Sequence, residues 1–185
     1  MSATPDDLRA AIEEVLVALR TLSAFARYSD VVPRSGRPAS AKSIEALERR
    51  LGLSLPPTYR QFLTWHDGYE WLAYPGHMLS VKELSPGGEY WDDIKQWKIE
   101  TAEAGYGDVL DGLVIAYMDQ PNNWAYLDPN RIANDGEWAV VLHVPGVDPA
   151  VYPDLTAFLR ARAASARQAK EWTVQRQAEG GTRPI

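Results

Sequence analysis

SIEALERRLG at residues 43–52, followed by LSLPPTYRQFL at residues 53–63, is the stretch of sequence that decides the fold. Apolar residues recur every three or four positions in both segments, which predicts two amphipathic helices. Ser40 can cap the first helix, and Gly52 can end it because glycine readily adopts a left-handed backbone. Proline loses little in the first turn of a helix, so the two adjacent prolines predict where the second helix begins.

Helices are also expected at both ends of the chain. Residues 5–27 place apolar side chains at helical spacing, with two aspartates in a favourable position near the start. Asp154 can cap a last helix that continues through Ala- and Arg-rich sequence toward Trp172. Residues 179–185 are expected to be a flexible tail, so the predicted single domain spans residues 1–178.

The middle of the chain changes from helical to strand periodicity. Residues 113–117, 123–127 and 138–144 are short, rich in β-branched or aromatic side chains, and separated by turn residues. They predict successive antiparallel strands, with a further short strand near 78–81 and a polar helix over 89–104. The pattern therefore predicts an α+β fold, with a mainly antiparallel sheet of about four to six strands flanked by helices.

Composition excludes several classes of protein. The chain has 185 residues, a formal net charge of −6 and no cysteine, which removes disulfides, thiolate metal sites and cysteine nucleophiles. The N-terminus lacks the basic-then-apolar order of a signal peptide, and no apolar run approaches the roughly 20 residues of a membrane span. We therefore expect a cytoplasmic protein that binds neither a membrane nor nucleic acid, because an acidic chain repels phosphate backbones.

No motif for catalysis or metal binding stands out. The three histidines, His66, His77 and His143, lack the spacing that places two imidazoles on one metal. The glycines between 105 and 112 fit a helix stop better than a phosphate loop, and the clustered carboxylates fit a solvated face better than an acid–base pair. We therefore expect no catalytic residue, no metal, no cofactor and no enzymatic activity.

Two segments interleave aromatic residues with acids, YEWLAY at 69–74 and EYWDD at 89–93. An interface favours buried aromatic anchors within a charged rim, whereas a core favours aliphatic residues without acids. Ordinary partial burial of these aromatics is the alternative. The interface interpretation predicts these protein-binding residues, the last two as weaker candidates: Glu70, Trp71, Tyr74, Glu89, Trp91, Asp92, Asp93, Asp119 and Trp124.

The order of landmarks resembles the SUKH superfamily, in particular its yeast cell-wall-assembly and killer-toxin-resistance type. The run from Ser43 to Gly52 is similar to an I-x-x-L-E-x-x-L-G signature, and Leu55-Pro56 followed by Tyr59-x-x-Phe62-Leu63 continues it. The resemblance covers residues 38–160. Here Asp67-Gly68-Tyr69 stands where the family has an Asn-Gly-Gly turn, and the two end helices are additions to the family core.

The resemblance implies a SUKH-like fold and, for bacterial members, a role as an immunity protein that binds and blocks a cognate toxin. An acidic surface with aromatic anchors would suit a basic toxin, of which a nuclease is one candidate. The chain itself would be a monomer or a homodimer.

Two other functions stay open. A non-enzymatic regulator or scaffold of the same fold would use the added helices for docking. An enzyme or small-molecule binder would use polar groups such as His66, Asp67 or His143 on the concave side of the sheet.

Overall fold

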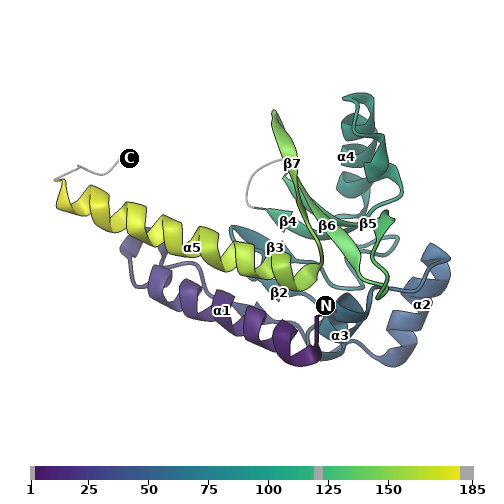
Figure 1. Ribbon diagram of the computed structural model, residues 1–185, viewed down its shortest axis with the longest axis horizontal. Coiled ribbons are helices and arrows are strands. Elements are labelled where there is room, and N and C mark those ends of the chain that lie inside the picture. Colours follow the sequence, from purple (N-terminus) through teal and green to yellow (C-terminus); the bar gives the residue numbers. More distant parts are fainter. Residues whose placement is uncertain (1–2, 119–122, 180–185) are drawn as a thin grey trace.

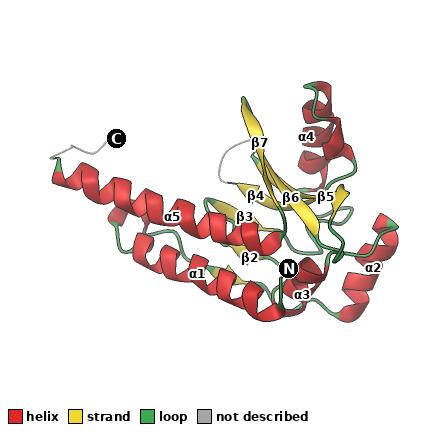
Figure 2. Ribbon diagram, in the orientation of Figure 1, coloured by secondary structure: helices red, strands yellow, loops and turns green. Residues whose placement is uncertain are grey.

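The computed structural model describes residues 3–118 and 123–179, which build one antiparallel sheet packed against helices (Figure 2). The order of the strands in the sheet follows the chain. This confirms the predicted α+β class, although the sheet has seven strands where four to six were expected. The strands are β1 (Arg34–Ser35), β2 (Tyr69–Glu70), β3 (Gly76–Met78), β4 (Leu113–Met118), β5 (Trp124–Ile132), β6 (Trp138–Val144) and β7 (Val147–Tyr152).

The helices begin where the capping residues predict. Ser40 accepts a hydrogen bond from the Ser43 N–H at 3.1 Å, and Asp154 accepts one from the Ala157 N–H at 2.7 Å. Gly52 ends its helix with a φ of 68°. The helices are α1 (Pro5–Ser23), α2 (Ala41–Leu51), α3 (Pro57–Trp65), α4 (Trp91–Glu103) and α5 (Leu155–Ala178), with 3₁₀ turns η1 (Ala26–Tyr28) and η2 (Gly107–Leu110).

Helices α1 and α5 lie side by side and run in the same direction (Figure 1). Arg160 of α5 forms ion pairs with Asp7 and Glu14 of α1, both at 3.6 Å. Phe158 of α5 packs edge-on against Tyr152 of β7, with 5.5 Å between the ring centroids. The two added helices therefore cover one face of the sheet and belong to the domain core.

Helix α4 covers the opposite face. Trp124 of β5 pairs with His143 of β6, so their side chains share a face, and Trp97 of α4 lies 5.8 Å from each of these rings. At the start of α4, Tyr90 stacks on Tyr117 of β4 at 5.4 Å. Large rings thus fill the space between α4 and the sheet.

The last helix ends close to the predicted boundary. Helix α5 runs to Ala178, and Glu179 is its C-cap residue. The rest of the predicted tail, residues 180–185, lies outside the described residues. None of the described helices is both long and apolar enough to cross a membrane.

Replacing Leu19 by Ala should test whether α1 is part of the cooperative fold. Leu19 is fully buried, and removing such a side chain typically costs about 2–5 kcal/mol of unfolding free energy. Val17, on the same helix, is 49 % exposed, so Val17→Ala should stay within about 0.5 kcal/mol of wild type. Urea unfolding followed by tryptophan fluorescence measures the unfolding free energy of both variants. Equal losses in the two variants would contradict the assignment of α1 to the cooperative fold.

Candidate functional site

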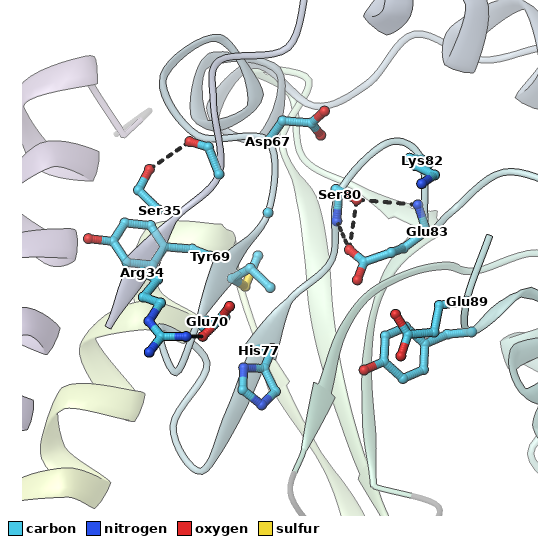
Figure 3. A pocket seen from close by; sticks show the side chains of 14 residues that line it. Arg34, Ser35, Asp67, Tyr69, Glu70, His77, Ser80, Lys82, Glu83 and Glu89 are labelled. Atoms are coloured by element: carbon cyan, nitrogen blue, oxygen red, sulfur yellow. Dashed lines mark hydrogen bonds and ion pairs between the residues drawn. The ribbon is translucent and has the colours of Figure 1, made fainter. Parts of the chain in front are cut away.

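A cleft of about 490 Å³ opens where the short strands at one edge of the sheet meet the loop before α4 (Figure 3). Its walls come from residues 34–36 and from three segments within residues 67–90. We call this cavity the acidic cleft. It is lined by Arg34, Ser35, Gly36, Asp67, Gly68, Tyr69, Glu70, His77, Met78, Ser80, Lys82, Glu83, Glu89 and Tyr90.

The hairpin of β2 and β3 forms one wall of the acidic cleft. Trp71, in the turn, has a φ of 66°, which is uncommon for a bulky residue. Its N–H donates to Nδ1 of His77 at 3.1 Å, and the two rings lie 5.1 Å apart. At Gly76 a Cβ atom would overlap the carbonyl oxygen of Tyr117, so glycine permits the close approach of β3 to β4. The hairpin is therefore held at both its turn and its last strand.

The segment after β3 forms the opposite wall. Asp67 accepts a hydrogen bond from the Val81 N–H at 2.6 Å. Glu83 accepts two hydrogen bonds from Ser80, one from its N–H and one from its hydroxyl, both at 2.7 Å. Burial raises the pKa of the Asp67 carboxyl, the Val81 hydrogen bond opposes this, and the nearby Glu83 raises the pKa further. The wall thus holds two carboxylates close together.

Negative charge predominates in the acidic cleft. Its lining contains the carboxylates of Asp67, Glu70, Glu83 and Glu89 but only two cationic side chains, Arg34 and Lys82. Arg34 lies 3.6 Å from Glu70, in an exposed ion pair that contributes little to stability. A basic group from a partner would therefore meet an excess of carboxylates.

The structure brings together two of the acidic residues that we predicted to be in contact with a partner. Glu70 and Glu89 come from separate segments, yet both line the acidic cleft. Trp71 is half-buried next to the cleft, where its N–H donates to His77, one of the lining residues. One surface feature therefore contains residues from both aromatic–acidic segments.

The remaining predicted residues on α4 lie in its first turn, outside the cleft lining. Asp92 and Asp93 are exposed, and Asp92 forms an ion pair with Lys95 at 2.7 Å. The half-buried Trp91 ring has the cations of Arg50 and Lys95 near it, each 5.7 Å from its centroid. These residues extend the acidic surface but do not line the cavity.

Two of the predicted aromatic anchors are not accessible to a partner, so these predictions are wrong. Tyr74 exposes only 7 % of its surface and Trp124 only 3 %, so both are core residues. Trp124 belongs to the layer of rings under α4, where it contacts Trp97 and Tyr117. Asp119, also predicted, lies outside the described residues.

Sequence reasoning missed Asp67, Glu83 and Arg34 as cleft residues. Asp67 was considered only as a turn residue and as a polar group for the enzyme alternative, and neither Glu83 nor Arg34 was singled out. The spacing of Ser80 and Glu83, which matches a capping box, was a usable local signal. Arg34 offered none, because its place depends on the pairing of β1 with β2.

The histidines do not converge on one site. Nδ1 of His66 lies 2.6 Å from the hydroxyl of Ser35, His77 lines the acidic cleft, and His143 lines a separate cavity beside Trp97. Burial lowers the pKa of both His66 and His143. Over residues 3–118 and 123–179, no group of three or more His, Cys, Asp or Glu side chains could hold a metal ion.

The raised pKa of Asp67 predicts a pH-dependent contribution to stability. A folded-state pKa above the unfolded value favours the protonated carboxyl in the native protein, so stability decreases as pH rises through the folded pKa. Compared with Asp67→Asn, which retains an acceptor for Val81, wild type should therefore gain unfolding free energy as pH falls from neutral toward the ordinary pKa. Urea unfolding across this range measures the difference.

The exposed Asp148 supplies the matched control for this titration. Asp148→Asn makes the same change in net charge as Asp67→Asn. Subtracting its pH dependence of unfolding free energy from that of Asp67→Asn leaves the part that is specific to Asp67. If the unfolding free energy of wild type relative to Asp67→Asn stays constant with pH, or decreases on acidification, the environment assigned to the Asp67 carboxyl is contradicted.

Comparison with known proteins identifies the family. A search of curated proteins finds no match for this chain. The sequence model of the SMI1 / KNR4 family (SUKH-1) matches residues 38–161, about two thirds of the chain and close to the 38–160 expected from the landmarks. The match spans the region from just before α2 to the first turns of α5 and includes the acidic cleft except for Arg34, Ser35 and Gly36. The chain therefore belongs to the SMI1 / KNR4 family (SUKH-1).

Proposed function

We propose that this protein is an immunity protein that binds a cognate toxin and neutralises it by occlusion, without catalysis. The observation that carries the proposal is the acidic cleft, where Glu70 and Glu89 line one cavity from separate segments. Membership of a SUKH family supports an immunity-type role.

The charge of the cleft suits a basic partner. Four carboxylates and two cations leave an excess of negative charge in the lining, and the exposed Asp93 extends it along the surface. Surfaces of opposite charge accelerate association and select partners, so a toxin with a basic surface, such as a nuclease, fits this cleft best. Inhibition then needs only that the bound protein covers the toxin's own active site.

Half-buried aromatic rings supply apolar contact area around the carboxylates. Tyr69 and Tyr90 both line the cleft with part of each ring accessible, and Trp71 lies next to His77. Tyrosine and tryptophan are enriched where interfaces gain most of their binding energy. The cleft thus combines groups that attract a basic partner with groups that hold it.

The added helices give little support to the scaffold alternative. The apolar face of α1 is used within the domain, where Leu8, Val15 and Leu19 are fully buried. A docking helix would instead leave such a face unpartnered. The enzyme alternative is likewise weakened, because Asp67 and His143 line different cavities.

Reversing charge in the cleft should weaken binding of the toxin. The probe is the product of the neighbouring gene, co-purified with this protein and then titrated by calorimetry. The double variant Glu70→Lys, Glu89→Lys should lower affinity by about 10-fold or more, with a loss that shrinks as salt is added. It should also lower rescue of cells from the toxin on co-expression.

Glu103→Lys is the control for charge reversal outside the cleft, because Glu103 is exposed at the far end of α4 and is not in the cleft lining. The affinity of the Glu103→Lys variant for the toxin should stay within about twofold of that of wild type. The proposal fails if the neighbouring gene product neither binds nor is toxic, or if wild type gives no rescue. Equal effects of the cleft variant and of Glu103→Lys would move the interface away from the cleft.

A further inference from the structure

A second cavity, of about 290 Å³, lies between α2 and α4 and has a different chemistry. It shares no lining residue with the acidic cleft. We call it the Lys98 pocket. It is lined by Arg50, Leu51, Leu84, Trp91, Ile94, Lys98, Leu110, Asp111, Gly112, Leu113 and Val114.

Two cations from different helices line the Lys98 pocket, and backbone oxygens are their main partners. The Lys98 ammonium donates to the carbonyl oxygens of Leu110 at 3.0 Å and Gly112 at 2.5 Å. The Arg50 guanidinium donates to the Leu84 carbonyl at 2.6 Å and to the Ser85 hydroxyl at 2.8 Å. Among the described residues, no carboxylate lies within 4.0 Å of either cation.

Both cations retain unused donors. An ammonium has three N–H groups and a guanidinium five, whereas two hydrogen bonds are formed by each here. Burial lowers the pKa of Lys98, and only the nearby Asp111 raises it. The pocket therefore holds positive charge that an incoming anion can neutralise through charge-assisted hydrogen bonds.

Asp111 also lines the pocket, and the rest of the lining is apolar. Six aliphatic side chains and the half-buried Trp91 surround the cations, and the volume is at the low end of the range for small-molecule pockets. A hydrated inorganic ion would leave this surface uncovered. A small anion with an apolar body would cover it and meet the cations at the same time.

We propose that the Lys98 pocket binds a carboxylate attached to a short apolar chain, with the carboxylate at Arg50 and Lys98 and the chain on the aliphatic wall. Free short-chain acids and the C-terminal residue of a peptide share this chemistry. Trp91, which does not line the acidic cleft, lines this pocket. The proposal does not depend on the identity of the toxin.

The test is a titration of the full chain by amide NMR with three probes. Hexanoate should shift the Gly112 and Leu113 amide signals saturably. Hexanol, which lacks the charge, and acetate, which lacks the chain, should each bind at least about 10-fold more weakly. N-acetyl-leucine distinguishes the sources: tighter binding than hexanoate indicates a peptide C-terminus, and weaker binding indicates a free acid.

Variants separate this site from non-specific uptake. Arg50→Met and Lys98→Met should each weaken hexanoate binding by about 10-fold. Lys42→Met is the matched control, because Lys42 is exposed on α2, outside the lining, and its replacement should leave binding unchanged. Since Lys98→Met also removes bonds to two carbonyl groups, Arg50→Met and the probe series decide the outcome if that variant fails to fold.

Hexanoate binding no tighter than hexanol, or binding unaffected by Arg50→Met in the folded variant, would overturn the proposal. Absence of any saturable shift in the wild-type protein would also overturn it. The toxin-binding proposal is tested separately at Glu70 and Glu89, which lie outside this pocket.

Discussion

The packing of aromatic rings between the sheet and α4 is the interaction on which both candidate sites depend. The ring contacts extend from Tyr90 on Tyr117, at 5.4 Å, to Tyr106 on His143, at 5.0 Å, with Trp97 and Trp124 between them. These separations lie within the range of favourable aromatic pairs. Because rings are larger than aliphatic side chains, they set how α4 sits over the sheet. The acidic cleft meets the start of this layer at Tyr90, and the Lys98 pocket lies beneath α4 on its other side.

This layer also explains the unusual composition of the chain. Seven Trp and nine Tyr against three Phe is typical of interfaces, and four of these residues, Trp71, Tyr74, Trp91 and Trp124, were predicted to bind a partner. Trp124 instead fills the space between the layers, and Tyr74 is buried in the β2–β3 turn region. Neither ring has an acid next to it in sequence. The burial of each depends on packing between segments that are distant in the chain, such as Trp97 on Trp124, and no local pattern reports such packing.

The helices and central strands were predictable because their signals are local. Caps such as Ser40 and Asp154 lie within one turn of the helices that they begin, and six of the seven residues of β6 are apolar. Strand β7 carried no such signal, because most of its residues are exposed and Pro149 interrupts it. Strands β1 and β2 have two residues each, and they exist only because Arg34 and Glu70 meet across more than thirty residues of chain. Such pairings are products of tertiary structure, which a single sequence does not encode locally.

The elements with local sequence signals form the rigid part of the molecule, and the strands formed by tertiary pairing carry the candidate function. The long strands β4, β5 and β6 are covered on both faces, whereas β1, β2 and β3 are short and lie toward the edge of the sheet, where β1 and β2 are partly or fully exposed. Segments with few buried contacts open at lower free energy than the core. The bonds from Trp71 to His77 and from Val81 to Asp67 therefore matter beyond their individual strength, because they hold the walls of the cleft in place before a partner arrives. A preformed cleft lowers the entropy cost of binding, which favours tight association from a surface of modest size.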